Sequence, residues 1–158
     1  MGLDMYLTKK TYIGANYDHN NVVGTINITK NGTPININFN RVSYIEEQVG
    51  YWRKANAIHN FFVNNVMDED DCLPHYVSKE QLQQLLDLCN KVKDFDPNVD
   101  NEESLEDLLP TTSGFFFGST EYDEYYLEDI KSTIPMLESV LKELEDDSNA
   151  SIYYQASW

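Results

Sequence analysis

Residues 22–40, VVGTINITKNGTPININFN, alternate apolar and polar side chains on both sides of Asn31-Gly32. An Asn-Gly pair between two alternating runs favours a two-residue type I′ turn, because both residues accept positive φ. The stretch therefore predicts a β-hairpin. Pro34 lacks a backbone N–H, which places it at the start of the second strand or at a sheet edge.

Further strands are expected on both sides of this hairpin. Near the N-terminus, Leu3, Met5 and Leu7 alternate with polar or aromatic neighbours, which indicates a strand with one buried face. Residues 115–117 are three phenylalanines between glycines, which predicts a short buried strand. Residues 152–158 indicate a last strand.

The helical signals lie between these strands. A helical period is expected over Ile45–Val66, and a second helix starts at Ser78, where Gln81 completes a capping box. A short turn at 104–109 is ended by Pro110, and a long helical pattern covers 120–146. The second helix should bury Leu82, Leu85, Leu86, Cys89 and Val92, and Pro135 predicts a kink or a break into two helices in the long one. Residues 14–21 and 94–103 are expected to be loops.

Together these elements predict a single α+β domain over residues 1–158. Its antiparallel sheet has about four to five strands, with three to four helices packed on one face. Residues 1–43 supply the strand and hairpin region, and 44–150 are mainly helical with a short central strand. Residues 151–158 supply the terminal strand.

The charge of the chain limits the functions open to it. It has 158 residues, 27 acidic against 11 basic, and a formal net charge of -16. Residues 1–66 hold four acidic and six basic residues, whereas 67–158 hold 23 acidic and five basic ones. Direct binding of nucleic acid is not expected, because it requires Lys and Arg to displace counterions. No apolar run is long enough for a membrane span, and two cysteines with no secretory leader favour a cytoplasmic location.

Polar residues on apolar helical stripes indicate a site. With helical spacing, Asn56 and His59 fall beside Trp52, with Arg53 at the edge of that sector, and Asp129 shares a stripe with two tyrosines. One reading is an aromatic and basic pocket in which arginine binds a phosphate or carboxylate and the rings stack on a base. The other is a closed internal network of Asp129 with His59 or Arg53 and tyrosine hydroxyls. The pocket would be lined by Trp52, Arg53, Asn56, His59, Phe116, Tyr122, Tyr126 and Asp129.

Catalytic and metal signatures are weak. Residues 68–72 followed by His75 contain ligand types, but they lack the spacing of a calcium loop, and no Cys-x-x-Cys pair exists for zinc. A Cys72–His59 nucleophile pair has no local signature, and no phosphate-binding glycine loop is present. We therefore expect no metal and no cofactor. A small enzyme that uses His59 and Asp129 stays open as one alternative.

The motifs already discussed are specific enough to suggest a family. They comprise Met1-Gly2-Leu3-Asp4-Met5-Tyr6-Leu7, Val49-Gly50-Tyr51-Trp52-Arg53-Lys54-Ala55-Asn56-Ala57-Ile58-His59, Asp71-Cys72 with Tyr76-Val77-Ser78, Leu108-Leu109-Pro110-Thr111, Gly114-Phe115-Phe116-Phe117-Gly118 with Tyr122-Asp123, and Ser157-Trp158. Over nearly the whole chain they resemble a family of small bacteriophage and prophage proteins that has no established activity. The resemblance implies a setting, the host-cell cytoplasm, and no chemistry.

Three functions are compatible with these observations. The leading hypothesis is a non-enzymatic phage accessory protein, active in counter-defence, that sequesters a small anionic nucleotide-type ligand in the pocket. The first alternative is a nucleic-acid mimic whose acidic surface, including Asp68, Glu69, Asp70 and Asp71, blocks a basic host nuclease or defence protein. The small enzyme is the second. The oligomeric state stays open, since Trp158 and Tyr153-Tyr154 could pair across a dimer.

Overall fold

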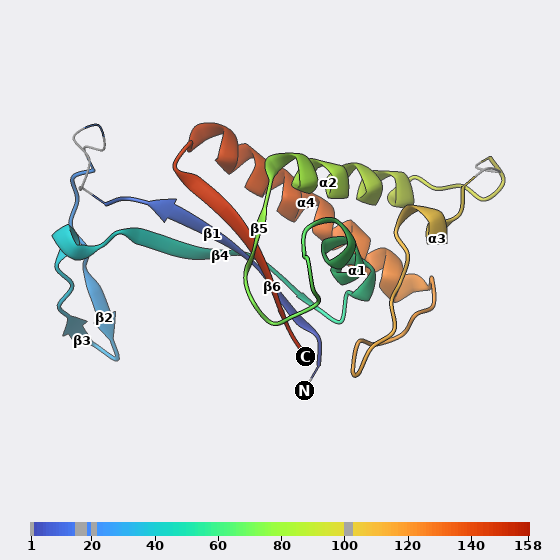
Figure 1. Cartoon of the computed structure of the whole chain (residues 1–158), viewed down its shortest axis with the longest axis horizontal. Helices are drawn as coiled ribbons and strands as arrows, with labels where there is room; N and C mark the ends of the chain where they lie inside the picture. The colour runs from blue at the N-terminus through green and yellow to red at the C-terminus, as the bar shows by residue number, and fades with distance from the viewer. Residues whose placement is uncertain (1, 15–18, 20–21, 100–102) are drawn as a thin grey trace.

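The computed structural model describes residues 2–14, 19, 22–99 and 103–158. Its main sheet has four antiparallel strands in the order β4-β1-β6-β5, and a second sheet pairs β2 with β3 (Figure 1). The strands are β1 (Asp4–Tyr12), β2 (Ile28–Lys30), β3 (Thr33–Ile35), β4 (Tyr44–Arg53), β5 (His75–Val77) and β6 (Ala150–Ser157). The predicted α+β fold with an antiparallel sheet is confirmed.

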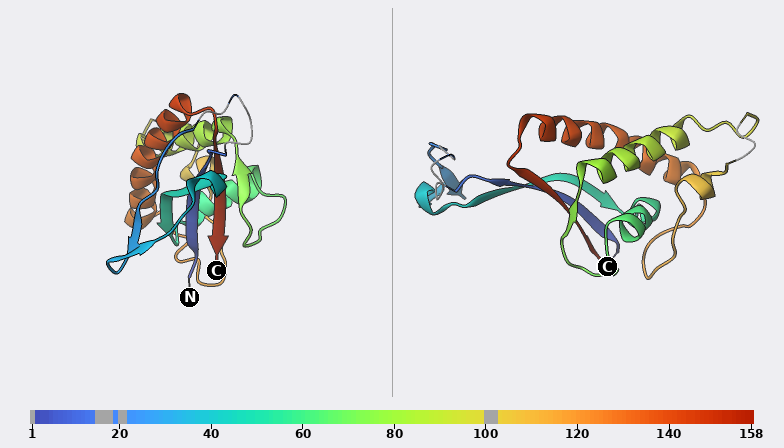
Figure 2. Two further views of the ribbon diagram at one scale, coloured as in Figure 1. Left: turned by 90° about the vertical axis from the view of Figure 1, so that its left-hand side faces the viewer. Right: turned by 45° about the horizontal axis from the view of Figure 1, so that its top comes forward.

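Helices cover one side of the main sheet (Figure 2). They are α1 (Asn56–Asn65), α2 (Lys79–Lys93), α3 (Leu105–Leu108) and α4 (Glu124–Asp146), and a 3-10 turn, η1, spans Phe39–Arg41. The capping box at Ser78 forms as predicted, and α2 buries the five apolar residues expected of it. None of the helices in the described part of the chain combines the length and apolar character needed to cross a membrane.

The core lies between this helical layer and the sheet. Leu3, Met5 and Leu7 are fully buried, which confirms the alternation predicted for the first strand. Tyr154 of β6 is also fully buried and stacks on Phe62 of α1, with ring centroids 3.9 Å apart. Two large aromatic rings in offset contact therefore fix α1 against the middle of the sheet.

The predicted hairpin forms, but it stands apart from the main sheet. Asn31 and Gly32 have φ of 52° and 78°, both positive as a type I′ turn requires. Strands β2 and β3 have three residues each and expose all their side chains. They lie at the tip of a ribbon formed by the distal halves of β1 and β4 (Figure 1).

The helix predicted from Ile45 is wrong over its first half, where β4 runs instead. Residues 44–53 pair with β1 along its whole length, and Lys10 meets Glu46 across the strands with 3.0 Å between nitrogen and oxygen. A Cβ at Gly50 would come within 2.5 Å of the Met136 sulfur, so a larger residue here would force the Met136 side chain of α4 to move. The region 44–150 therefore begins with a strand, because cross-strand pairing outweighs a local helical period.

One more local prediction is wrong, and another, a kink or a break at Pro135, is decided only as to the break. Phe115–Phe117 form a turn in place of a strand: Phe116 has φ of 65°, and only Phe117 of the three is buried. Helix α4 runs through Pro135 without a break into two helices. Pro135 and Lys131 both lie on the exposed side of α4, so the carbonyl that loses its helical partner can be hydrated.

Two expectations concern segments that are only partly described. Of the loops predicted at 14–21 and 94–103, residues 15–18, 20–21 and 100–102 lie outside the described part of the chain. The remaining residues of these loops belong to no helix or strand. Strand β5, in contrast, was not predicted, because three residues are too short for a period to be recognised.

Candidate functional site

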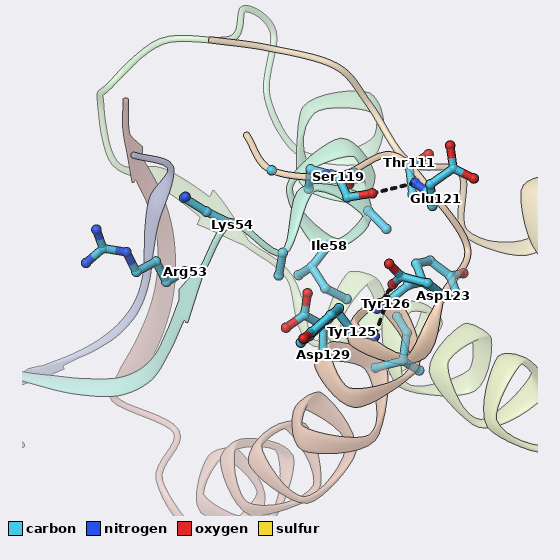
Figure 3. A pocket seen from close by; sticks show the side chains of 15 residues that line it. Arg53, Lys54, Ile58, Thr111, Ser119, Glu121, Asp123, Tyr125, Tyr126 and Asp129 are labelled. Atoms are coloured by element: carbon cyan, nitrogen blue, oxygen red, sulfur yellow. Dashed lines mark hydrogen bonds between the residues drawn. The ribbon is translucent and has the colours of Figure 1, made fainter. Parts of the chain in front are cut away.

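A cavity of about 290 Å³ opens where the end of β4 meets the starts of α1 and α4 (Figure 3). Arg53 and Lys54 lie on its strand side, and Tyr125 and Asp129 lie on its helix side (Figure 3). The remaining lining residues are Ala55, Asn56, Ala57, Ile58, Thr111, Gly118, Ser119, Glu121, Asp123, Tyr126 and Ile130.

Lys54 sits at a strained junction between β4 and α1. Its φ of 62° is in the left-handed region, which is unusual for a residue with a long side chain. Its N–H donates to the Leu3 carbonyl at 2.8 Å, and its carbonyl accepts from Asn56 N at 2.8 Å. No hydrogen bond or ion pair joins its ammonium group to another described residue. Strain of this kind is often found at binding sites, where the surrounding structure holds the backbone in place.

Gly118 allows the opposite loop to approach this junction. Its φ is 93°, and a Cβ there would lie 3.3 Å from the Lys54 Cβ. A side chain at position 118 would thus be strained and would also press on Lys54. Lys54 and Gly118, both with left-handed backbone, thus form adjoining parts of the cavity wall.

Asp129 projects a half-buried carboxylate from α4 into the cavity (Figure 3). Burial, with smaller effects of Glu128 and Asp123, raises the pKa of this carboxyl to about 6. Within the described residues it has no hydrogen bond and no ion pair. A half-buried carboxylate normally finds a partner, so Asp129 is available to one from outside the chain.

Asn56 and Tyr126 form part of the cavity wall, and their polar side-chain groups are already hydrogen-bonded within the protein. The Asn56 amide donates to the carbonyls of Phe117 at 3.2 Å and Ser119 at 2.7 Å, and its oxygen accepts from Thr112 N at 3.3 Å. Tyr126 donates its hydroxyl to the Leu109 carbonyl at 3.0 Å, and burial raises its pKa. These bonds hold loop 109–119 against α1 and α4.

Four of the eight residues predicted for the pocket line this cavity: Arg53, Asn56, Tyr126 and Asp129. The Arg53 guanidinium is turned away from Asp129 (Figure 3) and lies 3.9 Å from Asp4.

The other four predicted residues lie elsewhere. Trp52 is buried in the sheet and donates to Thr133 Oγ1 at 2.8 Å. Tyr122 accepts a hydrogen bond from Thr111 N at 3.2 Å. Phe116 is exposed in its turn, and His59 points into the core. Lys54 was missed because it falls on the opposite side of the predicted helix from Asn56 and His59, and no sequence signal marks a left-handed lysine. Tyr125 lies three residues after Tyr122 and four before Asp129, so its helical spacing could have found it.

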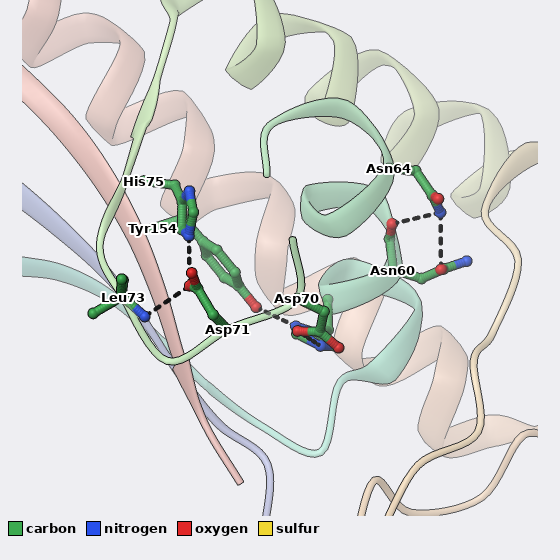
Figure 4. Close-up of polar contacts among 8 residues, drawn as sticks. Asn60, Asn64, Asp70, Asp71, Leu73, His75 and Tyr154 are labelled. Carbon is green, nitrogen blue, oxygen red and sulfur yellow. Dashed lines mark hydrogen bonds and ion pairs between the residues drawn. The ribbon is translucent and has the colours of Figure 1, made fainter. Parts of the chain in front are cut away.

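His59 belongs to a separate buried network (Figure 4). Its Nδ1 is 2.7 Å from the Tyr154 hydroxyl, and its Nε2 is 3.3 Å from Asp70, without hydrogen-bond geometry. Burial lowers the pKa of His59, and the Asp70 charge opposes this effect. Part of the closed network that was the alternative to a pocket thus exists, with Asp70 and Tyr154 in place of Asp129 and Arg53.

The four acidic residues 68–71 differ in whether their carboxylates have a partner within the chain. Asp70 faces His59, and Asp71 accepts from His75 at 2.7 Å and from Leu73 N at 2.9 Å (Figure 4). These bonds lower the pKa of Asp71. Asp68, Glu69 and Asp70 are exposed and Asp71 is half-buried, so the segment keeps an acidic surface although two of its four carboxylates face histidines of the chain.

Nucleophile and metal sites were also considered. Cys89 is buried in α2, and burial raises the pKa of its thiol to about 12, which makes it unreactive. Cys72 is exposed and has no hydrogen bond from its thiol to a described residue. In the described ranges no three His, Cys, Asp or Glu residues come together in a way that could hold a metal ion.

Comparison of the chain with family models, with curated proteins and with solved structures found no match. The chemistry of the cavity is therefore the main guide to function. It presents the Lys54 ammonium on one side and the Asp129 carboxylate on the other, with an exposed tyrosine ring, Tyr125, beside Asp129. The carboxylates of Glu121 and Asp123 also belong to its lining.

Proposed function

We propose that the protein is a non-enzymatic binding protein that sequesters a small nucleotide-type anion in the cavity between β4 and α4. The observation that carries this proposal is that Lys54 and Asp129, two charged groups without partners among the described residues, line opposite sides of one cavity. Asp129 is half-buried and Lys54 is exposed, so it is the unpaired carboxylate that costs stability. A ligand that donates a hydrogen bond to Asp129 and places its anionic group at Lys54 would offset that cost.

The arrangement suits a ligand with an anionic end and a hydrogen-bond donor end. The Lys54 ammonium would bind a phosphate as a point charge. The Asp129 carboxylate would accept hydrogen bonds from the amino or imino groups of a base. Tyr125, 75% exposed on the first turn of α4, would supply a surface for stacking.

The size of the cavity favours a mononucleotide over a larger signal. Its volume of about 290 Å³ lies at the lower end of the range of roughly 300–1,000 Å³ found for ligand sites. A nucleoside phosphate of one base and one or two phosphates is the class we expect.

The resemblance to phage proteins supports a setting for this activity. Arg53, Lys54, Asn56 and Asp123 belong to the motifs that carry the resemblance, and all four line the cavity. Sequestration of a host nucleotide signal in the host cytoplasm, and so counter-defence on behalf of a phage, is the role we propose for this protein.

The test is thermal unfolding of the purified protein with a panel of linear and cyclic mononucleotides and with inorganic phosphate. A ligand at 100 times its dissociation constant should stabilise the protein by about 2.7 kcal/mol, a shift of several degrees. We expect Lys54→Asn and Asp129→Asn to abolish the shift. Asparagine is chosen at position 54 because it tolerates the left-handed backbone.

Lys142→Gln is the matched control, since it removes one exposed positive charge of α4 that lies outside the cavity. This variant should keep the full shift. The ligand should also be recovered chemically intact after incubation. The proposal fails if no nucleotide shifts the unfolding temperature, or if Lys142→Gln weakens binding as much as Lys54→Asn does.

A further inference from the structure

The face of the main sheet that is turned away from the helices is rich in tyrosine. Residues directly opposite each other in an antiparallel pair share a face, and three such pairs here are Tyr–Tyr. They are Tyr6–Tyr51 and Tyr12–Tyr44 between β1 and β4, and Tyr76–Tyr153 between β5 and β6. Six of the eleven tyrosines of the chain thus lie on one side, which we call the open face.

The tyrosine rings of the open face touch one another and remain accessible. Ring centroids are 5.5 Å apart in the first pair, 5.1 Å in the second and 6.1 Å in the third. Tyr44, Tyr51 and Tyr76 are 50%, 42% and 58% exposed. Helices α2 and α4 lie on the other side of the sheet (Figure 2). Tyr6, Tyr12 and Tyr153, the partners of these three rings, are half-buried. Exposed tyrosine rings gathered on one sheet face are typical of a protein-binding surface.

A hollow of about 210 Å³ lies on the open face beside Tyr153. It is lined by Thr8, Lys10, Glu46, Pro74, Tyr153 and Gln155, which come from three strands and the loop before β5. The open face is therefore not flat, and an aromatic ring of a partner could fit into this hollow.

The charged groups of the open face are paired with each other. Lys10 lies 3.0 Å from Glu46, and Arg53 lies 3.9 Å from Asp4. The opposite side of the molecule is different, because α4 carries seven acidic residues and two lysines. Helix α4, with seven acidic residues and two lysines, therefore places a net charge of -5, out of -16 for the chain, away from the open face.

We propose that two copies of this chain pack through their open faces in a symmetric dimer. A two-fold axis would set the tyrosine pairs of one copy against those of the other, as in the aligned packing of two sheets. This arrangement buries neutral surface and leaves the acidic α4 helices on the outer sides of the dimer, where their mutual repulsion is smallest.

The alternatives agree less well with these observations. A nucleic-acid strand would need free cations, and both cations named above are paired with carboxylates. Dimerisation through an edge of the terminal strand is less favourable, because β6 pairs with β1 along one edge and with β5 over residues 152–154 of the other.

The mass of the protein in solution tests the proposal, measured by sedimentation equilibrium from about 1 to about 100 μM, where association of moderate strength is visible. We expect twice the monomer mass at the upper end. Tyr51→Lys and Tyr76→Lys should each raise the dissociation constant at least about tenfold, because each places a charge in the interface in both copies. Tyr125→Lys, the same change on the helical side, should leave it unchanged.

Salt provides a second reading of the same equilibrium. The outer helices of a dimer through the open face repel each other, so salt should screen this repulsion and lower the dissociation constant. A different dimer, in which the Lys30 and Arg41 region of one copy meets an acidic helix of the other, depends on charge attraction, so salt should raise its dissociation constant. A monomer at every concentration, weakening by salt, or an equal effect of Tyr125→Lys would each overturn the proposal. If Tyr51→Lys does not fold, Tyr76→Lys decides, since Tyr76 makes no hydrogen bond through its side chain to a described residue.

Discussion

The Tyr154 hydroxyl and His59 Nδ1 are 2.7 Å apart, a hydrogen bond that joins an inner strand of the sheet to α1 inside the core. Both side chains are fully buried. Tyr154→Phe removes only the hydroxyl and leaves the imidazole nitrogen without a partner. We expect a loss of about 1–3 kcal/mol in the free energy of unfolding, measured by urea denaturation.

Tyr153→Phe is the control for this change. Tyr153 lies on the open face, so the loss of its hydroxyl should lower the free energy of unfolding by less than about 0.5 kcal/mol. Equal costs for the two variants would show that the buried hydrogen bond contributes nothing specific.

The charge of Asp70 should be visible in the titration of His59. Burial lowers the pKa of His59, and Asp70 at 3.3 Å raises it in part. Asp70→Asn should therefore lower this pKa further, which NMR of the imidazole signals measures. Asp71→Asn, one residue along, should leave the pKa of His59 unchanged, because Asp71 contacts His75.

The same titration sets the sign of a pH effect on stability. Since the folded-state pKa of His59 lies below its unfolded value of 6.5, the unfolded chain binds the proton more readily. The contribution of the neutral, buried imidazole is present above 6.5 and is lost as pH falls through that value toward the folded pKa. In Asp70→Asn the folded-state pKa of His59 is lower still, so the free energy of unfolding should continue to fall down to a lower pH than in the wild type.

Thr133 holds the indole of Trp52 in place. Trp52 Nε1 donates to Thr133 Oγ1 at 2.8 Å, and both residues are buried. Thr133→Val keeps the shape but leaves the indole N–H without an acceptor, so we expect a loss of about 1–3 kcal/mol in urea denaturation. Ser132→Ala removes an exposed hydroxyl from the adjacent position and should change stability by less than about 0.5 kcal/mol.

Asp129 should destabilise the free protein at neutral pH. Its folded-state pKa of about 6 lies above the unfolded value of 3.8, so the folded protein binds the proton more readily and stability falls as pH rises through this interval. Asp129→Asn should therefore gain on the order of 1–2 kcal/mol over the wild type above pH 7, and little near pH 4. Urea denaturation across pH measures this difference.

Glu138→Gln serves as the control for Asp129→Asn. It neutralises an exposed carboxylate of the same helix, and its effect should vary much less between the two pH values. A gain from Asp129→Asn that does not depend on pH would contradict the assignment of the raised pKa to this residue.

Pro135 should limit the stability of α4. Pro135→Ala restores a backbone N–H and so a hydrogen bond to the Lys131 carbonyl, on the exposed side of the helix. We expect a gain of about 1–3 kcal/mol in the free energy of unfolding, reduced in part because alanine gives the unfolded chain more freedom. Ser139→Ala, also exposed on α4, should gain only a few tenths of a kcal/mol, and a loss of stability in Pro135→Ala would show that the helix needs the proline.

Local signals accounted for the elements whose stability is local. The turn at Asn31-Gly32, the capping box at Ser78 and the apolar face of α2 depend on residues within a few positions of one another. The strand at 44–53 was missed because its pairing with β1 joins residues about 40 positions apart, and such pairing is not encoded in a local period.

The candidate site divides in the same way. The sequence alone singled out Asn56, His59 and Asp129 as polar residues in apolar surroundings, and it indicated an antiparallel sheet with one buried face. Only the tertiary structure decided that Asp129 faces Lys54 across a cavity while His59 is enclosed by Tyr154 and Asp70. The physical reason is that a side chain's partner is set by packing between elements distant in sequence, whereas its polarity, its helix caps and its turns are set by its neighbours along the chain.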